Sequence, residues 1–328
     1  MPKYFLLLLL LSAVAPSITW ACAGCESSLS SDWQEAEKKT YKLDLRFDLM
    51  NQNSLRSGTA KIDGAAASQI VNNGTRQDVP VYTKNNVLTL SGEYEMNKDW
   101  KFGVELPVVM RKHSALGTAS DGSTAGAGGG QYDSSTTGLG DAKLIARYLG
   151  LTQIHHFGLI GGLKVPTGGH KQMGVSTDTA NAAPVAIARD LQLGTGTVDL
   201  ILGVFDSVSF GKNWDYFSEG KYQMALNQSQ QYKSGDKFNL NLGIKYLAYS
   251  SFTPQVQLNT IYEQHDKGSA ADITNSGATI VYVSPGVSVP VMENAQAYGF
   301  VQVPAYQKFT GVQLASKFVA SLGATYAF

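Results

Sequence analysis

Charged side chains occupy alternate positions of several otherwise apolar segments, and these are the residues most able to act on a solute. The stretch YKLDLRFDL (residues 41–49) is the clearest case, with Lys42, Asp44, Arg46 and Asp48 between apolar neighbours. Strict alternation predicts a β-strand with one apolar and one charged face. If the apolar faces meet lipid, the charged faces enclose a polar interior, where they either line a passage for solutes or pair with one another.

The same pattern on other segments defines a set of candidate residues for the lining of that interior and for contact with a solute. The set consists of Arg46, Lys101, Glu105, Asp141, Lys143, Arg147, Lys164, Asp199, Glu219, Lys221, Lys245, Glu263 and Lys317. Acidic and basic members are mixed, and the sequence shows no ring of one sign, which would predict ion selectivity. A neutral polar group joins them, formed by Asn239, Asn241, Gln255, Gln257 and Asn259. We expect a mixed-charge lumen suited to small polar or aromatic solutes.

A short cysteine motif, Cys22-Ala-Gly-Cys25, stands apart from these segments near the start of the chain. It is followed by Glu26, so it is not the CxxCH signal for haem attachment, and a lone CxxC supplies at most two of the four ligands of a structural zinc. His155 and His156, in a predicted turn, would have to complete a metal site. The alternatives are a disulfide, lipid attachment at either cysteine, and partial removal with a signal peptide.

Motifs for catalysis or nucleotide binding are missing from the sequence. The Gly-rich stretch GSTAGAGGGQ (122–131) has no GK[ST] after it and is not a phosphate loop. The chain has no G-x-S-x-G, and His113 beside Ser114 is an adjacency in sequence rather than a triad. We therefore expect no enzymatic activity and no cofactor.

The composition narrows the class of protein. The chain of 328 residues has 26 basic and 26 acidic residues, and this zero net charge gives no reason to expect a nucleic-acid partner. Charged residues make up 16% of the chain, below the usual share of about a quarter. Together with 34 glycines and 16 tyrosines, this low charge suits either a lipid-facing β protein or a soluble β-sandwich.

The one long apolar stretch opens the chain and is predicted to be a secretory signal peptide. A basic residue precedes an apolar run, Tyr4 to Ala15, that is too short to span a bilayer, and small residues follow. We place the signal peptide at residues 1–21, with cleavage as late as residue 23 left open. A short periplasmic segment with the Cys pair follows at 22–40, and the membrane domain is expected at 41–328.

Alternating patterns recur through this domain and predict about twelve strands. They cover residues 41–51, 86–97, 99–110, 139–149, 156–165, 197–209, 213–226, 236–247, 254–264, 278–290, 297–307 and 313–328. Connections after odd-numbered strands are long and those after even-numbered strands are short. Outer-membrane barrels have this organisation, with long external loops and short periplasmic turns. The sequence thus predicts an all-β fold, a transmembrane antiparallel up-and-down barrel with both ends in the periplasm.

Aromatic residues gather where the predicted strands meet the short turns, as in the interfacial girdle of a membrane barrel. The expected girdle contains Tyr94, Trp100, Phe102, Tyr148, Phe157, Trp214, Tyr216, Tyr246, Tyr298, Phe300, Tyr326 and Phe328. A chain that ends on Phe328 two positions after Tyr326 also looks like the C-terminal signature of bacterial outer-membrane barrels. We therefore expect a Gram-negative outer membrane as the location, with its lipid and the barrel-assembly machinery as partners.

Three stretches in the middle of the chain resemble a known family: TTGLGDAKLIARY, GLIGGLKVPTG and LGTGTVDLILGVF. They are similar to the outer-membrane transporters grouped under meta-pathway phenol degradation, in which a Gly-Leu-Gly-Asp strand precedes an LxxPTG strand and a GTGxxD strand. The matching residues are Gly138 to Asp141, Leu163 to Gly168 and Gly194 to Asp199. The start ACAGCESSLSSDW resembles a subgroup with a Cys pair after the signal. The resemblance implies a barrel that passes small organic molecules.

Two functions are open on this reasoning. The first, which we expect, is an outer-membrane pore for passive or facilitated diffusion of small solutes, aromatic or other organic ones among them. Its selectivity would be set by the mixed-charge lumen and by loops 111–138 and 166–196, the second of which is long enough to fold inward as a constriction. The other function is a non-conducting barrel that docks a periplasmic partner, such as a redox protein, through the N-terminal Cys segment.

Overall fold

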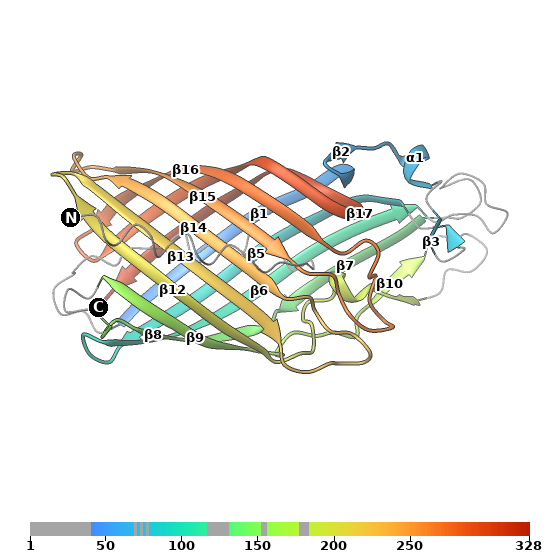
Figure 1. Cartoon of the computed structure of the whole chain (residues 1–328), viewed down its shortest axis with the longest axis horizontal. Coiled ribbons are helices and arrows are strands. Elements are labelled where there is room, and N and C mark those ends of the chain that lie inside the picture. Colours follow the sequence, from blue (N-terminus) through green and yellow to red (C-terminus); the bar gives the residue numbers. More distant parts are fainter. Residues whose placement is uncertain are drawn as a thin grey trace, which may run out of the picture.

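Antiparallel strands joined by turns close into a barrel (Figure 1). The computed structural model describes residues 41–68, 71–72, 75–76, 79–116, 131–151, 156–176 and 184–328. Eleven elements of this part of the chain form the ring, of which β17 supplies two strands, and the pairing of β8 with β6 closes it. They are β1 (Tyr41–Gly58), β5 (Val79–Glu95), β6 (Trp100–Leu116), β8 (Ala142–Tyr148), β9 (Phe157–Val165), β12 (Asp199–Phe210), β13 (Trp214–Ala225), β14 (Lys237–Tyr246), β15 (Thr253–Glu263), β16 (Ala278–Met292) and β17 (Ala295–Ala327). The prediction of a closed up-and-down antiparallel barrel is confirmed.

Shorter elements lie toward the end of the barrel where long connections join the strands (Figure 1). They are β2 (Ala60–Lys61), α1 (Gly64–Ser68), β3 (Val71–Asn72), β4 (Thr75–Arg76), β7 (Gln131–Leu139), β10 (Met173–Ser176), β11 (Pro184–Ala186) and the 3-10 helix η1 (Arg189–Leu191). None of the helices in the described part of the chain is long and apolar enough to cross a membrane. We call this end the loop end. The opposite end, where Tyr41 and Phe328 exchange backbone hydrogen bonds of 3.1 and 2.9 Å, is the terminal end.

The last strand, β17, folds back on itself near Gly311, whose φ of 65° lies in the left-handed region that favours glycine. Its first part pairs with β16 and its second part pairs with β1. The two parts lie side by side, because a Cβ added to Gly323 would clash with the Tyr298 ring. The element β17 therefore contains both of the strands predicted at 297–307 and 313–328.

Most strand predictions agree with the structure, and the differences concentrate at the loop end. The strands predicted at 156–165 and 254–264 match β9 and β15 to within one residue at each end. By contrast, β1 and β5 extend several residues further toward the loop end than predicted. The strand predicted at 139–149 is only the terminal-end part of an interrupted pair, β7 and β8.

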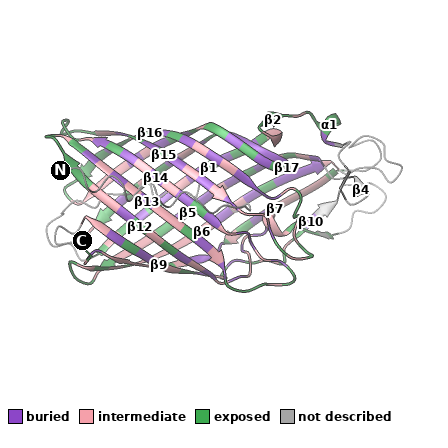
Figure 2. Cartoon of the chain, viewed as in Figure 1, coloured by how far each residue is buried: buried purple, intermediate pink, exposed green. Residues whose placement is uncertain are grey.

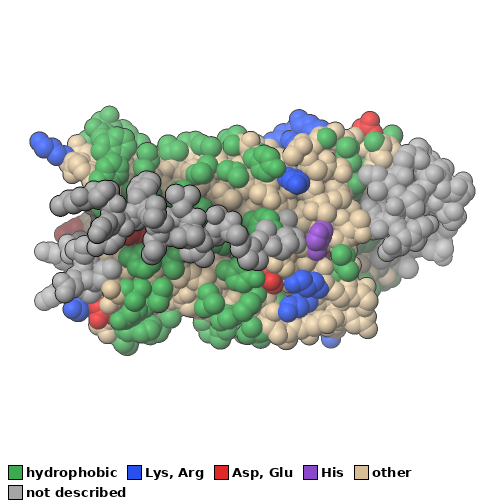
Figure 3. All heavy atoms as spheres, viewed as in Figure 1, with side chains coloured by type: hydrophobic (Ala, Val, Ile, Leu, Met, Phe, Trp, Pro, Cys, Tyr) green, Lys and Arg blue, Asp and Glu red, His purple; other side chains and the backbone are tan. Residues whose placement is uncertain are grey.

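Buried and exposed residues alternate along the strands of the barrel (Figure 2). On β1, Asp44 and Arg46 are buried, whereas Leu43 and Leu45 are 44% and 48% exposed. A soluble protein buries its leucines and exposes its charges, so this arrangement is the one expected of a barrel in lipid. Hydrophobic side chains cover much of the strand region on the face shown in Figure 3.

An aromatic band surrounds the terminal end, as the girdle prediction requires. Tyr41 stacks on Tyr94 and on Phe328, with ring centroids 5.0 and 5.6 Å apart. Trp100 and Phe102 stack at 5.9 Å. These five rings come from β1, β5, β6 and the residue that follows β17. The band therefore crosses the place where β1 and β17 pair.

Tyr298 and Phe300 do not belong to this band, and their prediction as girdle residues is wrong. They are 6% and 3% exposed, and Tyr298 Oη donates to the Asp44 carboxylate at 2.9 Å inside the barrel. On this part of β17 the outward positions are those of Val301 and Val303, which are 46% and 49% exposed. Because a strand has a period of two, residues at 298 and 300 must face inward.

Candidate functional site

The wall of the barrel is interrupted between β7 and β8. Both strands pair with β6, β7 along its loop-end part and β8 along its terminal-end part. Gly140 and Asp141, between them, belong to neither strand. On the next strand along the wall, β9 ends at Val165, and the chain rejoins the sheet at β10, which pairs with β7. Residues 187–198, which precede β12, lie at this interruption, and we call them the inset segment.

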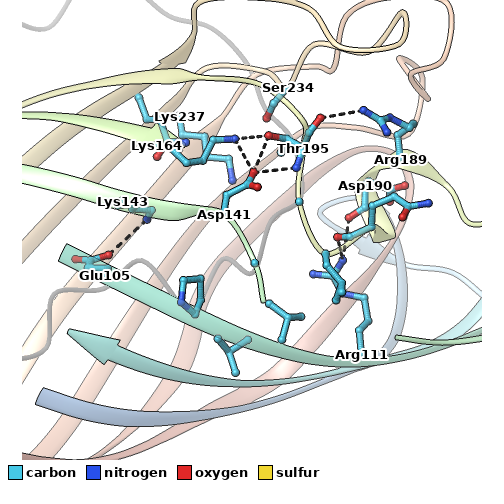
Figure 4. Close-up of a pocket in the computed structure, with 18 of the residues that line it drawn as sticks. Glu105, Arg111, Asp141, Lys143, Lys164, Arg189, Asp190, Thr195, Ser234 and Lys237 are labelled. Carbon is cyan, nitrogen blue, oxygen red and sulfur yellow. Dashed lines mark hydrogen bonds and ion pairs between the residues drawn. The ribbon is translucent and has the colours of Figure 1, made fainter. Parts of the chain in front are cut away.

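The Asp141 carboxylate joins the inset segment to the interruption (Figure 4). It accepts hydrogen bonds from the backbone N–H groups of Gly168 at 3.1 Å and Thr195 at 2.9 Å. It also accepts one from Thr195 Oγ1 at 2.9 Å and forms an ion pair of 3.1 Å with Lys164 Nζ. Lys164 in turn lies 3.0 Å from the Asp199 carboxylate. Because its oxygens are satisfied by these donors, Asp141 acts as a joint between segments; we call this cluster the Asp141 joint.

Two glycines let the segments of the joint approach backbone to backbone. A Cβ added to Gly168 would lie 2.7 Å from Gly194 Cα, closer than real Cβ contacts. The backbone N–H of Gly194 also donates to Gly169 O at 3.0 Å. These glycines belong to the LxxPTG and GTGxxD stretches, and Asp141 ends the Gly-Leu-Gly-Asp stretch. The three stretches singled out in the sequence therefore meet at one place in the barrel.

Arg111 on β6 holds the inset segment from another side of the lumen. Its Nε donates to Asn85 Oδ1 at 2.5 Å. Its Nη1 donates to the carbonyl oxygens of Asp190 and Gln192 at 3.2 and 2.9 Å. The inset segment is thus fixed between β6 and the Asp141 joint, and it occupies space inside the barrel as a constriction would.

Two cavities meet at Arg111 and Asp190, which line both of them. The inner cavity, of about 110 Å³, lies beside the Asp141 joint and is bounded in part by Val109 and Leu193 (Figure 4). The outer cavity, of about 450 Å³, is lined by the loop-end parts of β1, β5, β6 and β17 and by the inset segment. One arginine side chain and one turn of backbone therefore separate two spaces within the barrel.

Four of the predicted lumen residues line the inner cavity: Glu105, Asp141, Lys143 and Lys164. Lys143 and Glu105 approach each other across it at 3.9 Å, with their side chains 19% and 38% exposed. This pair is looser and more accessible than the Asp141–Lys164 pair. Glu105 and Lys143 therefore supply part of the polar surface that a solute would meet in the inner cavity.

Most of the remaining predicted charges form ion pairs on the interior face. Arg147 contacts Glu93 at 3.0 Å and Glu219 at 3.3 Å, and Lys221 contacts Glu219 at 2.9 Å. Other pairs join Arg46 to Asp48, Lys101 to Glu95, and Lys237 to Glu263, at 2.9, 2.7 and 3.1 Å. Of the two possibilities for interior charges, lining a passage or pairing with one another, these residues show the second.

Other polar contacts complete this interior. Lys245 is buried, with Nζ 5.8 Å from the centroid of the Phe217 ring. In the predicted neutral polar group, Asn259 Nδ2 donates to Asn241 Oδ1 at 2.9 Å and to Gln257 Oε1 at 3.1 Å. The amides form part of the packed wall and do not line either of the two cavities described above.

Lys317 does not join the buried lumen charges, because it is exposed. The pairing of β1 with β17 shifts by one residue here: Met50 faces Val319, and Gln52 faces Ser316. A bulge of this kind sets two residues opposite one and breaks the alternation of side chains. The prediction that Lys317 lines the lumen depended on unbroken alternation, which this shift interrupts, and it stays a prediction.

Arg111, Asn85 and the residues of the inset segment were not among the predicted site residues. The strand predicted at 99–110 stopped one position short of Arg111, whereas β6 continues to Leu116. The inward positions of this strand simply continue beyond Val109 with Arg111 and His113, which are both buried. Longer extension of the period-two pattern would have found them.

Burial changes the acidity of two groups in the loops beside the constriction. It raises the pKa of the Asp190 carboxyl above its ordinary value, while the Arg111 guanidinium opposes the rise. Burial, and then the Asp266 carboxylate, hold the pKa of the Tyr232 hydroxyl well above its ordinary value. Arg189 lies over that ring at 5.0 Å and donates to Thr195 O at 2.9 Å, so Tyr232 supports the inset segment as a neutral side chain.

The cysteine motif cannot be placed, because Cys22, Cys25 and His155 lie outside the described residues. His156 is described, and its Nδ1 lies 2.7 Å from Asp206 Oδ1 on β12. Within the described ranges no group of three or more His, Cys, Asp or Glu side chains is placed to hold a metal ion. The metal-site prediction and the disulfide or lipidation prediction therefore both stay predictions.

The structure is similar to that of the COG4313 outer membrane channel from Pseudomonas putida F1, with a TM-score of 0.63 at 14% sequence identity, over 91% of this chain and 98% of that one. The Ralstonia pickettii toluene transporter TbuX matches with a TM-score of 0.48 at 11% identity, over 89% and 90% of the two chains. The CymD monoaromatic hydrocarbon channel matches with a TM-score of 0.48 at 13% identity, over 89% of each. No family model and no curated protein matches the sequence. The chain thus has the fold of outer-membrane β-barrel channels.

Proposed function

We propose that this protein is an outer-membrane channel through which small organic solutes cross by passive or facilitated diffusion. The observation that carries this proposal is the pair of cavities inside a closed barrel, separated at Arg111 and Asp190. A barrel that served only as a scaffold would need no such spaces. The fold shared with an outer membrane channel supports the same class of function.

The lining of the inner cavity favours solutes that have an apolar body and a polar group. Val87, Pro107 and Val109 supply apolar surface on one side, and Glu105 and Lys143 supply charge on another. Ligand sites that combine a mostly apolar lining with a few polar groups orient such molecules. Aromatic compounds of the kind implied by the resemblance to phenol-degradation transporters fit this description, and we propose membership of that group.

Export and orientation follow from the same proposal. Residues 1–21 would be the signal peptide, and the segment at 22–40, with its Cys pair, would remain in the periplasm beside the terminal end. The aromatic band at that end would then lie at the periplasmic interface, and the loop end would face outward. Phe328, at the terminal end, would be available to the barrel-assembly machinery during insertion.

Conductance of the refolded full-length protein in a planar bilayer tests the channel. Replacement of Lys143 and Arg147 by Ala removes two cations from the interior, so we expect the ion preference to shift toward cations. The matched control is Lys112→Ala, which removes a cation from an exposed position of β6 and should leave the preference unchanged. Liposome swelling with a neutral aromatic solute measures passage of the proposed substrate class directly.

Demonstrably folded protein that neither conducts nor admits the aromatic solute would contradict the channel. In that case the scaffold function would be favoured, and the Cys22–Cys25 segment would be the place to search for its periplasmic partner. Conductance that is identical in the double variant and the wild type would leave a channel, but one whose path avoids the inner cavity.

A further inference from the structure

Arg111 is a buried cation whose hydrogen bonds go to neutral acceptors. It is 7% exposed, and its acceptors are one side-chain amide oxygen, on Asn85, and two backbone carbonyls. Among the described residues it forms no ion pair, unlike Arg46 and Arg147 in the same interior. A buried charge without a counter-charge is costly unless a ligand supplies one.

The guanidinium also keeps donors for a ligand. The bonds described above use Nε and Nη1, and no described residue accepts a hydrogen bond from Nη2. Because Arg111 lines both cavities, these donors are available to a molecule held in either space. Arginine presents its donors in a planar fork that matches the two oxygens of a carboxylate.

The outer cavity has room for an organic body beside that fork. Its volume is about 450 Å³, within the range of about 300–1,000 Å³ that small-molecule sites occupy. Apolar side chains contribute to its lining, among them Pro80, Leu191, Val312 and Leu314. A simple inorganic anion would leave this apolar surface in contact with water, whereas an organic acid would cover it.

Among the described residues, neither carboxylate of the same lining forms an ion pair with Arg111. Both oxygens of Asp272 already accept hydrogen bonds from Asn275, at 3.1 and 2.8 Å. Asp190 accepts a hydrogen bond from Arg111 at its backbone carbonyl, and its carboxyl attracts the guanidinium from a longer distance. His113, the other titratable group beside the arginine, donates to or accepts from Thr83 at 2.8 Å.

We propose that the outer cavity binds small organic monocarboxylates, with the carboxylate on the Arg111 guanidinium and the apolar body against the β5, β17 and inset side chains. The inference deepens the proposed channel function, on which it rests in taking this anion to be a transported solute. Since Arg111 also pins the inset segment through Asp190 O and Gln192 O, a bound carboxylate competes for the side chain that separates the two cavities.

Calorimetric titration of benzoate into the detergent-solubilised, refolded full-length protein tests the site. We expect saturable binding that Arg111→Gln weakens by about 10- to 100-fold, because it removes a charge-assisted fork. Lys112→Gln, the neighbouring exposed cation, is the matched control and should bind benzoate as the wild type does. Benzyl alcohol, which has the same ring without the charge, should bind weakly and equally to all three proteins.

A second variant guards against a folding defect in Arg111→Gln. Asn85→Asp keeps the arginine and gives it an internal carboxylate, so we expect a folded barrel that has lost benzoate affinity to a similar extent. Benzoate binding that survives in both variants would overturn the proposal. Inorganic phosphate that displaces benzoate at equal concentration would overturn the organic specificity, because a general anion site gains nothing from the apolar lining.

The result of the benzoate-binding test can be distinguished from the result of the channel test. Arg111-dependent benzoate binding by a protein that passes no solute would leave the site in place and refute transport. Passage of neutral aromatics with no benzoate binding would support the channel and refute the carboxylate site. Binding is measured at equilibrium in detergent, so neither result depends on the other.

Discussion

The half of the barrel near the terminal end (the terminal half) and the half near the loop end (the loop half) are organised differently. In the terminal half, neighbouring strands stay paired apart from a register shift between β16 and β17 near Pro290. Interior charges there meet partners such as Arg147 with Glu93 and Glu219, and aromatic rings lie on the outer surface. In the loop half, the wall is interrupted at Gly140 and Asp141 and the inset segment enters the lumen. The inner cavity lies beside this interruption, and the outer cavity is lined in part by the inset segment. The comparison teaches that the space for a solute is made by breaking the regular wall.

The largest expected effect comes from removing the Asp141 carboxylate. Asp141→Ala deprives Gly168 N and Thr195 N of their acceptor and leaves Lys164 with Asp199 as its remaining carboxylate partner. We expect the free energy of unfolding to fall by about 3 kcal/mol or more, as for a broken buried pair. Urea titration of the protein refolded into vesicles measures the change.

Glu93→Ala is the matched variant in the terminal half. Arg147 keeps Glu219 as a partner, so the loss should be about 1 kcal/mol. Equal losses for the two variants would contradict the view that the loop half depends on one central joint.

A smaller effect is expected from Gly168→Ala. The new Cβ would lie 2.7 Å from Gly194 Cα, and overpacking of this kind costs about 1–3 kcal/mol. Gly161→Ala on β9, the strand that precedes Gly168, is the control, since its Cβ would meet nothing within 4 Å. Protease cleavage within the inset segment should increase in the first variant only; cleavage that stays unchanged would show that the backbone contact is not needed to hold the segment.

Within the terminal half, the inside and outside of the wall can be compared through two tyrosines. Tyr298→Phe removes a donor to the buried Asp44 carboxylate, which should lower the free energy of unfolding by about 1.5 kcal/mol. Tyr94→Phe, on the outer aromatic band, should have no measurable effect because its hydroxyl is not needed for stacking on Tyr41. Denaturation midpoints of the two variants that coincide would argue against an interior role for Tyr298.

The smallest effect is expected at the rim of the loop end. Lys267 lies 3.9 Å from Asp236, and its side chain is 49% exposed. Lys267→Ala should therefore change the free energy of unfolding by no more than about 0.5 kcal/mol. A larger loss, measured by the same urea titration, would mean that the outer loops contribute to stability as the wall does.

The terminal half could be predicted from the sequence because its organisation is local. Alternation within one segment decides which face of a strand is charged, and the strands of this half, such as β9 and β15, appear where that pattern placed them. The positions of two residues do not follow from this pattern alone. Lys317 is exposed beside a bulge, and Tyr298 is buried because it occupies an inward position of its strand. Both depend on a single residue of register, which composition and spacing alone do not reveal.

The site in the loop half could not be predicted in the same way, because it depends on contacts between segments far apart in the chain. Three short motifs contain Gly140–Asp141, Gly168 and Gly194. No pattern within any one motif predicts that these backbones contact one another. The inward position of Arg111 follows from continuing the alternating pattern past residue 110, but its role in holding the inset segment does not. Its role is defined by carbonyls of Asp190 and Gln192, which are some 80 residues away in sequence.

The backbone bonds between Tyr41 and Phe328 have a kinetic consequence. They join the first and last residues of the barrel, so the ring is complete only when the whole domain has been synthesised and exported. Contacts of such sequence separation form slowly, and until they do, β1 presents an open edge that invites aggregation. A chain of this design must be kept unfolded in transit, and loss of even the final strand would leave it without any closed intermediate on which to stop.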